Sequence, residues 1–149
     1  MKSEEAKKNF LNGANCAQAV LCAFCDETGM DEETAMKIAS SFGGGMGRLR
    51  EVCGACSGMF MASGLIDGYS SPDATTEKKE HYARIQELAA KFKEKNGSII
   101  CRELIAEGND TNPVPSERTE KYYKKRPCAE YVADAAEILE DFLRKEGKM

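Results

Sequence analysis

Residues 53–64 have the sequence CGACSGMFMASG, a segment of mostly small side chains that begins with a pair of cysteines. We predict a helix from Cys53 to Ile66. Each glycine inside a helix costs about 1 kcal/mol relative to alanine, so the three glycines here need a compensating reason. Small side chains allow another backbone, or a bulky inorganic group, to approach closely. A tight helix crossing would explain Ala62, Ser63 and Gly64, but it would not explain the two cysteines.

These two residues, Cys53 and Cys56, form a Cys-x-x-Cys pair at the start of the predicted helix. In dithiol redox proteins the first thiol of such a pair is a nucleophile of low pKa, and the second resolves the mixed disulfide. The same spacing suits two ligands of one metal ion. The pair therefore indicates either dithiol chemistry or metal binding.

Three other cysteines follow local signals that start a helix. A capping box places Cys16 in the first turn of a helix, and a serine cap precedes Cys101. A proline suited to the first helical position precedes Cys128. A helix start carries partial positive charge and free N–H groups, which favour the thiolate that binds metals and attacks disulfides. We therefore select Cys16, Cys53, Cys101 and Cys128 as candidate ligands.

A glycine-rich segment, FGGGMGRLR at residues 42–50, precedes the central helix. No Gly-Lys-Ser/Thr follows it and no strand precedes it, so it does not match a nucleotide-binding loop. Its glycines can expose backbone N–H groups to an anion, and Arg48 and Arg50 bring positive charge beside Cys53. Both effects would lower a thiol pKa or compensate a negatively charged cluster, so Arg48 joins the candidate cofactor-binding residues.

The remaining sequence is helical in pattern, with no convincing period-two strand. We expect an all-α fold, with residues 1–149 forming a single compact domain of about five to seven helices. The predicted helices are 16–27, 32–41, 53–66, 72–95, 100–107 and 128–145. The stretch Gly108–Arg118 contains two prolines and is predicted to be the longest loop, a surface connection. The amphipathic helix at 72–95 permits a homodimer.

The composition limits the possible cellular location of the protein and the classes of partner that it can bind. The net charge of −4 gives no support for nucleic-acid binding. The first ten residues are polar and charged, which argues against a secretory signal, and no apolar run approaches the roughly 20 residues of a membrane span. We therefore expect a cytoplasmic protein, in a compartment that keeps thiols reduced. Seven cysteines cannot all pair within one chain, so metal binding or redox catalysis is the usual explanation.

The order of these motifs resembles the C_GCAxxG_C_C family of redox-active proteins over nearly the whole chain. The residues that carry the resemblance are Cys16, the glycine run with Arg48, Cys53-Gly54-Ala55 with Gly58, Cys101 and Cys128. The family name spells Gly-Cys-Ala where this chain reads Cys-Gly-Ala, and the chain adds Cys22, Cys25 and Cys56. The resemblance implies a redox role, and related domains in split-Soret cytochromes carry an iron-sulfur cluster. Those cytochromes also bind haem, but neither Cys-x-x-Cys segment here ends in the histidine of a c-type attachment motif, so no haem is expected.

Several other residues are expected to be structural. Cys22 and Cys25 lie three residues apart in an apolar stretch, where we expect buried, inert packing, with a second dithiol or metal pair as the alternative. His81, the only histidine, is expected to be solvated or partly packed on a Lys/Glu-rich helix. The segment Lys121–Arg126 mixes basic and aromatic residues and is expected to be a solvated face, although it could raise the potential around Cys128.

Three functions remain open. The first is an iron-sulfur protein, an electron carrier or redox sensor with an unknown redox partner, that uses Cys16, Cys53, Cys101 and Cys128 as ligands. The second is a thiol-disulfide oxidoreductase in which Cys53 attacks and Cys56, or another of the four cysteines, resolves. The third is a structural zinc protein with four-cysteine coordination.

Overall fold

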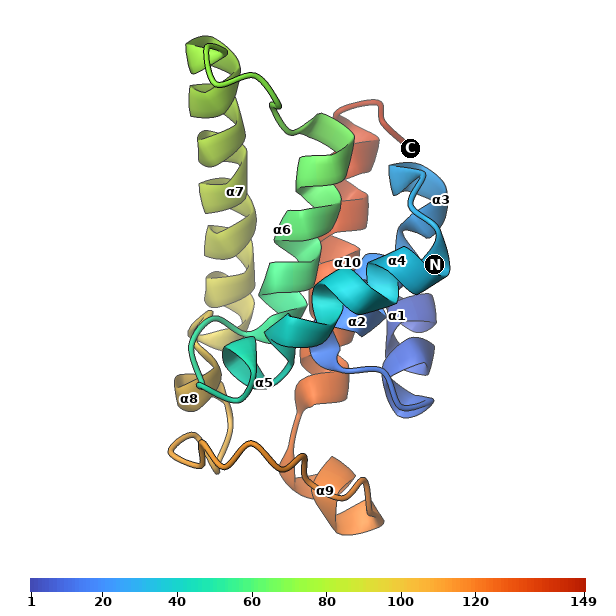
Figure 1. The fold of residues 1–149 in the computed structure, drawn as a ribbon, viewed down its shortest axis with the longest axis vertical. Coiled ribbons are helices and arrows are strands. Elements are labelled where there is room, and N and C mark those ends of the chain that lie inside the picture. Colours follow the sequence, from blue (N-terminus) through green and yellow to red (C-terminus); the bar gives the residue numbers. More distant parts are fainter.

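The computed structural model describes residues 1–149, except for the side chain of Lys125. The fold is all-α, as predicted, and among the described residues the one β-type contact is an isolated antiparallel bridge between Val52 and Ile100 (Figure 1). The helical elements are α1 (Lys2–Leu11), α2 (Cys16–Ala23), α3 (Cys25–Thr28), α4 (Glu32–Ala39), η1 (Ser40–Phe42), α5 (Gly43–Met46), α6 (Gly54–Asp67), α7 (Thr75–Asn96), α8 (Cys101–Leu104), α9 (Glu120–Lys125) and α10 (Cys128–Lys145).

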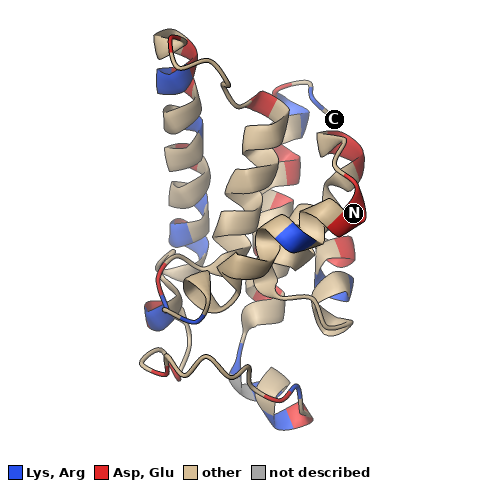
Figure 2. Cartoon of the chain, viewed as in Figure 1, with Lys and Arg blue, Asp and Glu red and all other residues tan. Residues whose placement is uncertain are grey.

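Helix α6 is the central element of the fold. It packs against α2, α7 and α10, while α1 packs against both α2 and α10. Apart from Asp67 at its end, α6 carries no charged residue, whereas α7, on the outside of the molecule, carries many (Figure 2). The largest side chains buried between these helices are Phe10, Phe24, Leu21, Met59, Phe92 and Leu139. An uncharged helix with small side chains is what a position buried on several sides requires.

The close crossing of α2 and α6 accounts for two of the glycines in α6. A Cβ atom on Gly58 would lie 2.6 Å from the carbonyl oxygen of Ala17, and one on Gly54 would lie 3.0 Å from Cβ of Cys16. Gly64 is different, because a Cβ atom there would meet only Nε2 of His81, at 3.8 Å. The predicted tight crossing exists, but it depends on Gly54 and Gly58 and not on Gly64.

The first predicted helix, at 16–27, is divided into α2 and α3 at Phe24. Phe24 has non-helical dihedral angles and a fully buried ring, so the chain turns there to bury the ring in the core. Helix α1 was not predicted, because only Ala6 and Phe10 are buried in an otherwise polar segment. Figure 1 shows that α6 and α10 run in the same direction and that α7 runs antiparallel to them. The starts of α6 and α10 therefore lie at one end of the bundle, next to the starts of α2 and α8, whereas α7 begins at the opposite end.

Among the described residues, no helix combines the length and the apolar character needed to cross a membrane.

Candidate functional site

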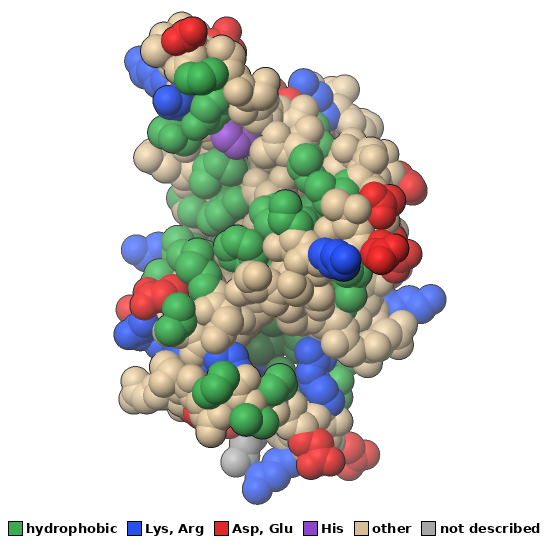
Figure 3. Space-filling view, viewed as in Figure 1, with side chains coloured by type: hydrophobic (Ala, Val, Ile, Leu, Met, Phe, Trp, Pro, Cys, Tyr) green, Lys and Arg blue, Asp and Glu red, His purple; other side chains and the backbone are tan. Residues whose placement is uncertain are grey.

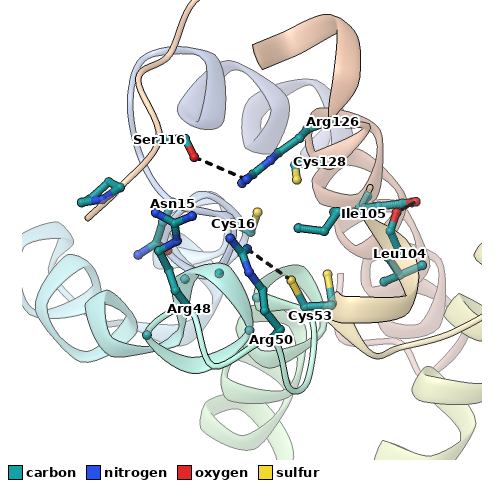
Figure 4. A pocket seen from close by; sticks show the side chains of 18 of the residues that line it. Asn15, Cys16, Arg48, Arg50, Cys53, Leu104, Ile105, Ser116, Arg126 and Cys128 are labelled. Carbon is teal, nitrogen blue, oxygen red and sulfur yellow. Dashed lines mark hydrogen bonds between the residues drawn. The ribbon is translucent and has the colours of Figure 1, made fainter. Parts of the chain in front are cut away.

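A cavity of about 300 Å³ lies at the end of the bundle where these helices begin. Four cysteines from four helix starts line it: Cys16, Cys53, Cys101 and Cys128. Figure 4 shows the labelled cysteines around one space, with arginine side chains entering from different elements. Cys16, Cys101 and Cys128 are the first residues of α2, α8 and α10, and Cys53 caps α6. Cys56 does not line the cavity; it is 0% exposed, one turn further along α6.

The isolated bridge between Val52 and Ile100 brings Cys53 and Cys101 together. The amide of Cys53 donates to the carbonyl oxygen of Ile99 over 2.7 Å, and the amide of Cys101 donates to that of Glu51 over 2.6 Å. These bonds hold the segment before α6 against the segment before α8. Two cysteines that are distant in sequence thus begin their helices side by side.

The glycine-rich segment closes tightly over these cysteines. Gly45 has a φ of 71°, and a Cβ atom there would lie 2.7 Å from Cβ of Cys101. Left-handed backbone continues through Met46, Arg48 and Arg50, whose φ angles are 68°, 68° and 62°. Such conformations cost about 1–2 kcal/mol for residues other than glycine and cluster at functional sites. The amides of Arg48 and Arg50 donate to the carbonyl oxygens of Gly43 and Gly44, so these two amides are used within the loop.

Cys16 and Cys128 form one thiol pair. The thiol of Cys16 donates a hydrogen bond to Cys128, and this bond lowers the pKa of Cys128 while raising the pKa of Cys16. Arg126, Arg118 and Arg50 lower the pKa of Cys128 further through their charges. The predicted effect of Arg126 on the potential around Cys128 is therefore confirmed.

Cys53 and Cys56 form a second thiol pair. A hydrogen bond from Cys56, together with the backbone amides of Ala55 and Cys56, lowers the pKa of Cys53. The same thiol bond and burial raise the pKa of Cys56 far above its ordinary value. The Cys56 thiol is thus the main cause of the lowered pKa of Cys53, and the backbone amides of the helix start add to it.

The same prediction is wrong for Cys16 and Cys101. Burial raises the pKa of the Cys101 thiol, and Arg50 only partly opposes this effect by hydrogen bonding and charge. For Cys16 the donated thiol bond and burial both favour the neutral form. At Cys101 burial outweighs any effect of the helix start, and at Cys16 the thiol bond to Cys128 does so together with burial.

Arginines supply the charge of the cavity wall. Its four lining arginines are Arg48, Arg50, Arg118 and Arg126, and no carboxylate among the described residues lines it. Arg48 pairs with Asp110 and Arg126 with Glu107, both from outside the cavity. Arg50 and Arg118 have no carboxylate partner in the described part of the chain. Arg118 donates instead to two backbone carbonyls and lies 4.3 Å from the centre of the Phe10 ring.

The loop after α8 forms another wall of the cavity. Pro113, Pro115 and Ser116 line it, so this loop is more than the plain surface connection expected from the sequence. Arg48 donates to the carbonyl oxygen of Val114, Arg50 to that of Asp110 over 2.7 Å, and Arg126 to Oγ of Ser116 over 3.3 Å. Figure 3 shows a hollow beside this loop with basic side chains near it. Arginines of the site therefore also hold its covering segment.

Arg48, the arginine selected from the sequence, lines the cavity but contacts the loop. Arg50 is the one that contacts a cysteine, since its Nη1 atom lies 3.7 Å from Sγ of Cys101. The sequence indicated the charge of Arg50 but not its burial. It gave no indication that Arg118 would line the cavity. An arginine is ordinarily exposed, so no sequence signal indicated that Arg50 would be buried.

The residues expected to be structural differ in their surroundings. Cys22 and Cys25 lie outside the cavity and are half-buried rather than buried, with a hydrogen bond between their thiols. Of the two expectations for His81, solvated or partly packed, the structure supports packing: the residue is 8% exposed, lies between α6 and α7, and is hydrogen-bonded to Arg84 (Figure 3). In the segment expected to be a solvated face, Lys121 and Lys124 are exposed, but Arg126 is buried and lines the cavity.

The fold and cavity define an all-α protein in which cysteines from four helix starts share one arginine-lined site. The chain belongs to the family described as "Putative redox-active protein (C_GCAxxG_C_C)", whose model matches residues 14–142. The resemblance seen in the sequence is thereby confirmed, and the family description supports a redox role. No curated protein and no solved structure matches the chain.

Proposed function

We propose that this protein binds an iron-sulfur cluster through Cys16, Cys53, Cys101 and Cys128 and uses it for electron transfer or redox sensing. The observation that carries the proposal is that these four side chains, from four separate helix starts, line one cavity. Four cysteine thiolates are the common ligand set of such clusters. The bound cluster would supply one-electron chemistry.

The charge of the wall fits this ligand set. A cluster held by four thiolates is an anion, and it is expensive to bury unless positive charge compensates it. Arg50 and Arg118 bring charge that no described carboxylate neutralises. Hydrogen bonds to ligand sulfurs tune the potential of a cluster, and Arg50 is already placed to donate one to Cys101.

The size of the cavity favours a cluster over a single zinc ion. Zinc in a structural site is bound by four donors at about 2.3 Å for sulfur, so its ligands crowd together. Within the described part of the chain, no three His, Cys, Asp or Glu side chains are close enough to hold one metal ion. Zinc shares the four-cysteine lining with the cluster, and the metal measurement below decides between them.

A specific observation favours a second candidate, a thiol-disulfide oxidoreductase. Cys53 has a lowered pKa and Cys56, bonded to it, a raised one, which suits an attacking and a resolving thiol. The Cys53 thiolate would attack a substrate disulfide and release one thiolate. Cys56, after losing its proton, would attack the sulfur of Cys53, releasing the second substrate thiolate and leaving a Cys53–Cys56 disulfide.

The decisive experiment is iron, zinc and acid-labile sulfide analysis of protein purified without oxygen from a reducing cytoplasm. The proposal expects iron and sulfide in matching amounts, and loss of most of both in Cys16→Ser. The matched control is Cys22→Ala, a cysteine outside the cavity, which should keep its cluster. Zinc alone would favour the structural alternative. Protein free of metal, with activity on disulfides, would favour the dithiol. In the cluster case the electron partner would be another redox protein.

A further inference from the structure

One nitrogen of the Arg50 guanidinium has no hydrogen-bond acceptor among the described residues. Arg50 is only 1% exposed, its Nε atom donates to the backbone carbonyl oxygen of Asp110, and its Nη1 atom donates to Sγ of Cys101. The Nη2 atom is buried and has no hydrogen-bond partner among the described residues. Leaving a buried charged donor unsatisfied costs roughly 1–3 kcal/mol or more. This donor therefore points to a partner that lies in the cavity.

The surroundings of Arg50 select an anion as that partner. The Arg50 side chain extends into the cavity between Cys16 and Cys53, and the side chains of Arg48 and Arg126 enter the same space (Figure 4). No described carboxylate lines this space to compete for the guanidinium. Guanidinium groups bind carboxylate and phosphate oxygens in a fixed, often two-pronged geometry.

The cavity has room for such a ligand besides the cysteines. Its 300 Å³ correspond to about ten water molecules at the volume of the liquid. The lining also includes the polar residues Asn15, Ser40 and Ser116, and Figure 4 shows Asn15 beside Arg48. A pocket with a few convergent polar groups in a partly apolar wall is typical of a small-molecule site.

We propose that the Arg48–Arg50 side of this cavity binds a small oxoanion, a molecule with a carboxylate or phosphate head group, through the free Nη2 donor of Arg50. The ligand is held next to Cys53 and Cys101, where the chemistry of the site takes place. This gives the protein a substrate or effector class that a pure electron carrier would not need. The anion site goes beyond the proposed cluster and does not depend on it, because it is built from arginine side chains.

Calorimetric titration of the oxygen-free protein tests the site, with inorganic phosphate and acetate as probes at a constant ionic strength set by chloride. We expect single-site binding of at least one probe, weakened about tenfold or more in Arg50→Gln because a charge-assisted bond is lost. Phosphate and acetate distinguish a tetrahedral from a planar head group. Arg144→Gln, an arginine paired with Glu140 on the far part of α10, is the matched control and should bind like the wild type.

A second variant keeps the test decisive if Arg50→Gln does not fold by circular dichroism. Arg48→Gln removes a neighbouring charge at the same end of the cavity and should weaken binding several-fold. The anion site would be overturned if both folded arginine variants bound the probes as tightly as the wild type. Heats no larger than those of chloride would also overturn it. Iron and sulfide measured on the same samples report the cluster separately. Protein with a cluster but no anion binding would contradict only this inference. Protein that binds the anion but contains no cluster would contradict only the cluster proposal.

Discussion

Nη1 of Arg50 lies 3.7 Å from Sγ of Cys101, so a fully buried guanidinium donates directly to one of the four cavity cysteines. The contact depends on left-handed backbone at Arg50 and on the bridge that places residue 101 beside residue 51. Burial raises the pKa of Cys101, and this guanidinium opposes the rise. Arg50 therefore favours the thiolate of Cys101 through its charge and its hydrogen bond, although burial outweighs this effect.

Replacing Arg50 with glutamine should make Cys101 less reactive. In protein freed of any metal, alkylation of Cys101 by neutral iodoacetamide at pH 8 should slow by roughly three- to tenfold, because a higher pKa leaves less thiolate. Mass spectrometry of the labelled peptides measures the rate, with Cys22 in the same sample as the internal reference. Unchanged or faster labelling of Cys101 would contradict the electrostatic role of Arg50.

Replacing Cys56 with serine separates the two proposed chemistries. Because Cys56 is 0% exposed and does not line the cavity, Cys56→Ser should keep its iron and sulfide content if the cluster proposal is right. The same variant should lose disulfide turnover if Cys56 is the resolving thiol. The measurements are metal analysis and reduction of a small disulfide substrate. Loss of iron in a folded Cys56→Ser protein would show that Cys56 is a ligand and would contradict our ligand set.

Two glycines of α6 offer a matched test of the crossing with α2. Gly58→Ala should destabilise the protein by about 1–3 kcal/mol, because the new Cβ atom would lie 2.6 Å from the carbonyl oxygen of Ala17. Gly64→Ala meets only the far end of His81, at 3.8 Å, and should stabilise by about 0.5–1 kcal/mol through helix propensity. Urea unfolding of both variants gives the two free energies. A Gly58→Ala variant as stable as the wild type, or more stable, would mean that the crossing is not tight at Gly58.

Local signals in the sequence were enough to predict where several helices begin. The capping box predicted at Asn15 and Gln18 is present, with both of its hydrogen bonds at 2.9 Å, and α10 begins at Cys128 directly after Pro127. These features depend on residues within one helical turn of each other, so a single sequence contains them. The all-α class followed from the same kind of information.

Contacts between distant segments could not be predicted in this way. The bridge between Val52 and Ile100 involves single residues and leaves no alternating pattern. The burial of Arg50 and the role of the 105–119 loop as a cavity wall both depend on that bridge, since it positions the glycine-rich segment against α8. The sequence thus identified candidate cysteines, whereas their common cavity and its arginine wall are tertiary features.

Cys22 provides a test of pH dependence outside the cavity. Burial raises the pKa of its thiol to about 12, with smaller contributions from Cys25 and Glu32, while an unfolded cysteine titrates near 8.5. The folded state therefore disfavours the thiolate. The resulting stability is fully present below about pH 8.5 and is lost as the pH rises toward the folded value, since only the unfolded chain releases the proton.

Cys22→Ala removes this titration, so the difference in unfolding free energy between wild type and variant should shrink steadily as the pH is raised from 8 to about 10.5. Urea unfolding at several pH values, under reducing conditions, measures that difference. Titrating groups that do not contact Cys22 are common to both proteins and cancel in the comparison, whereas the thiol of Cys25, bonded to Cys22, contributes to the difference. A difference that stays constant over this range would mean that the Cys22 thiol ionises as readily in the folded protein as in the unfolded chain. The half-buried pair of Cys22 and Cys25 would then be open to thiolate chemistry at neutral pH, as in the second-dithiol alternative.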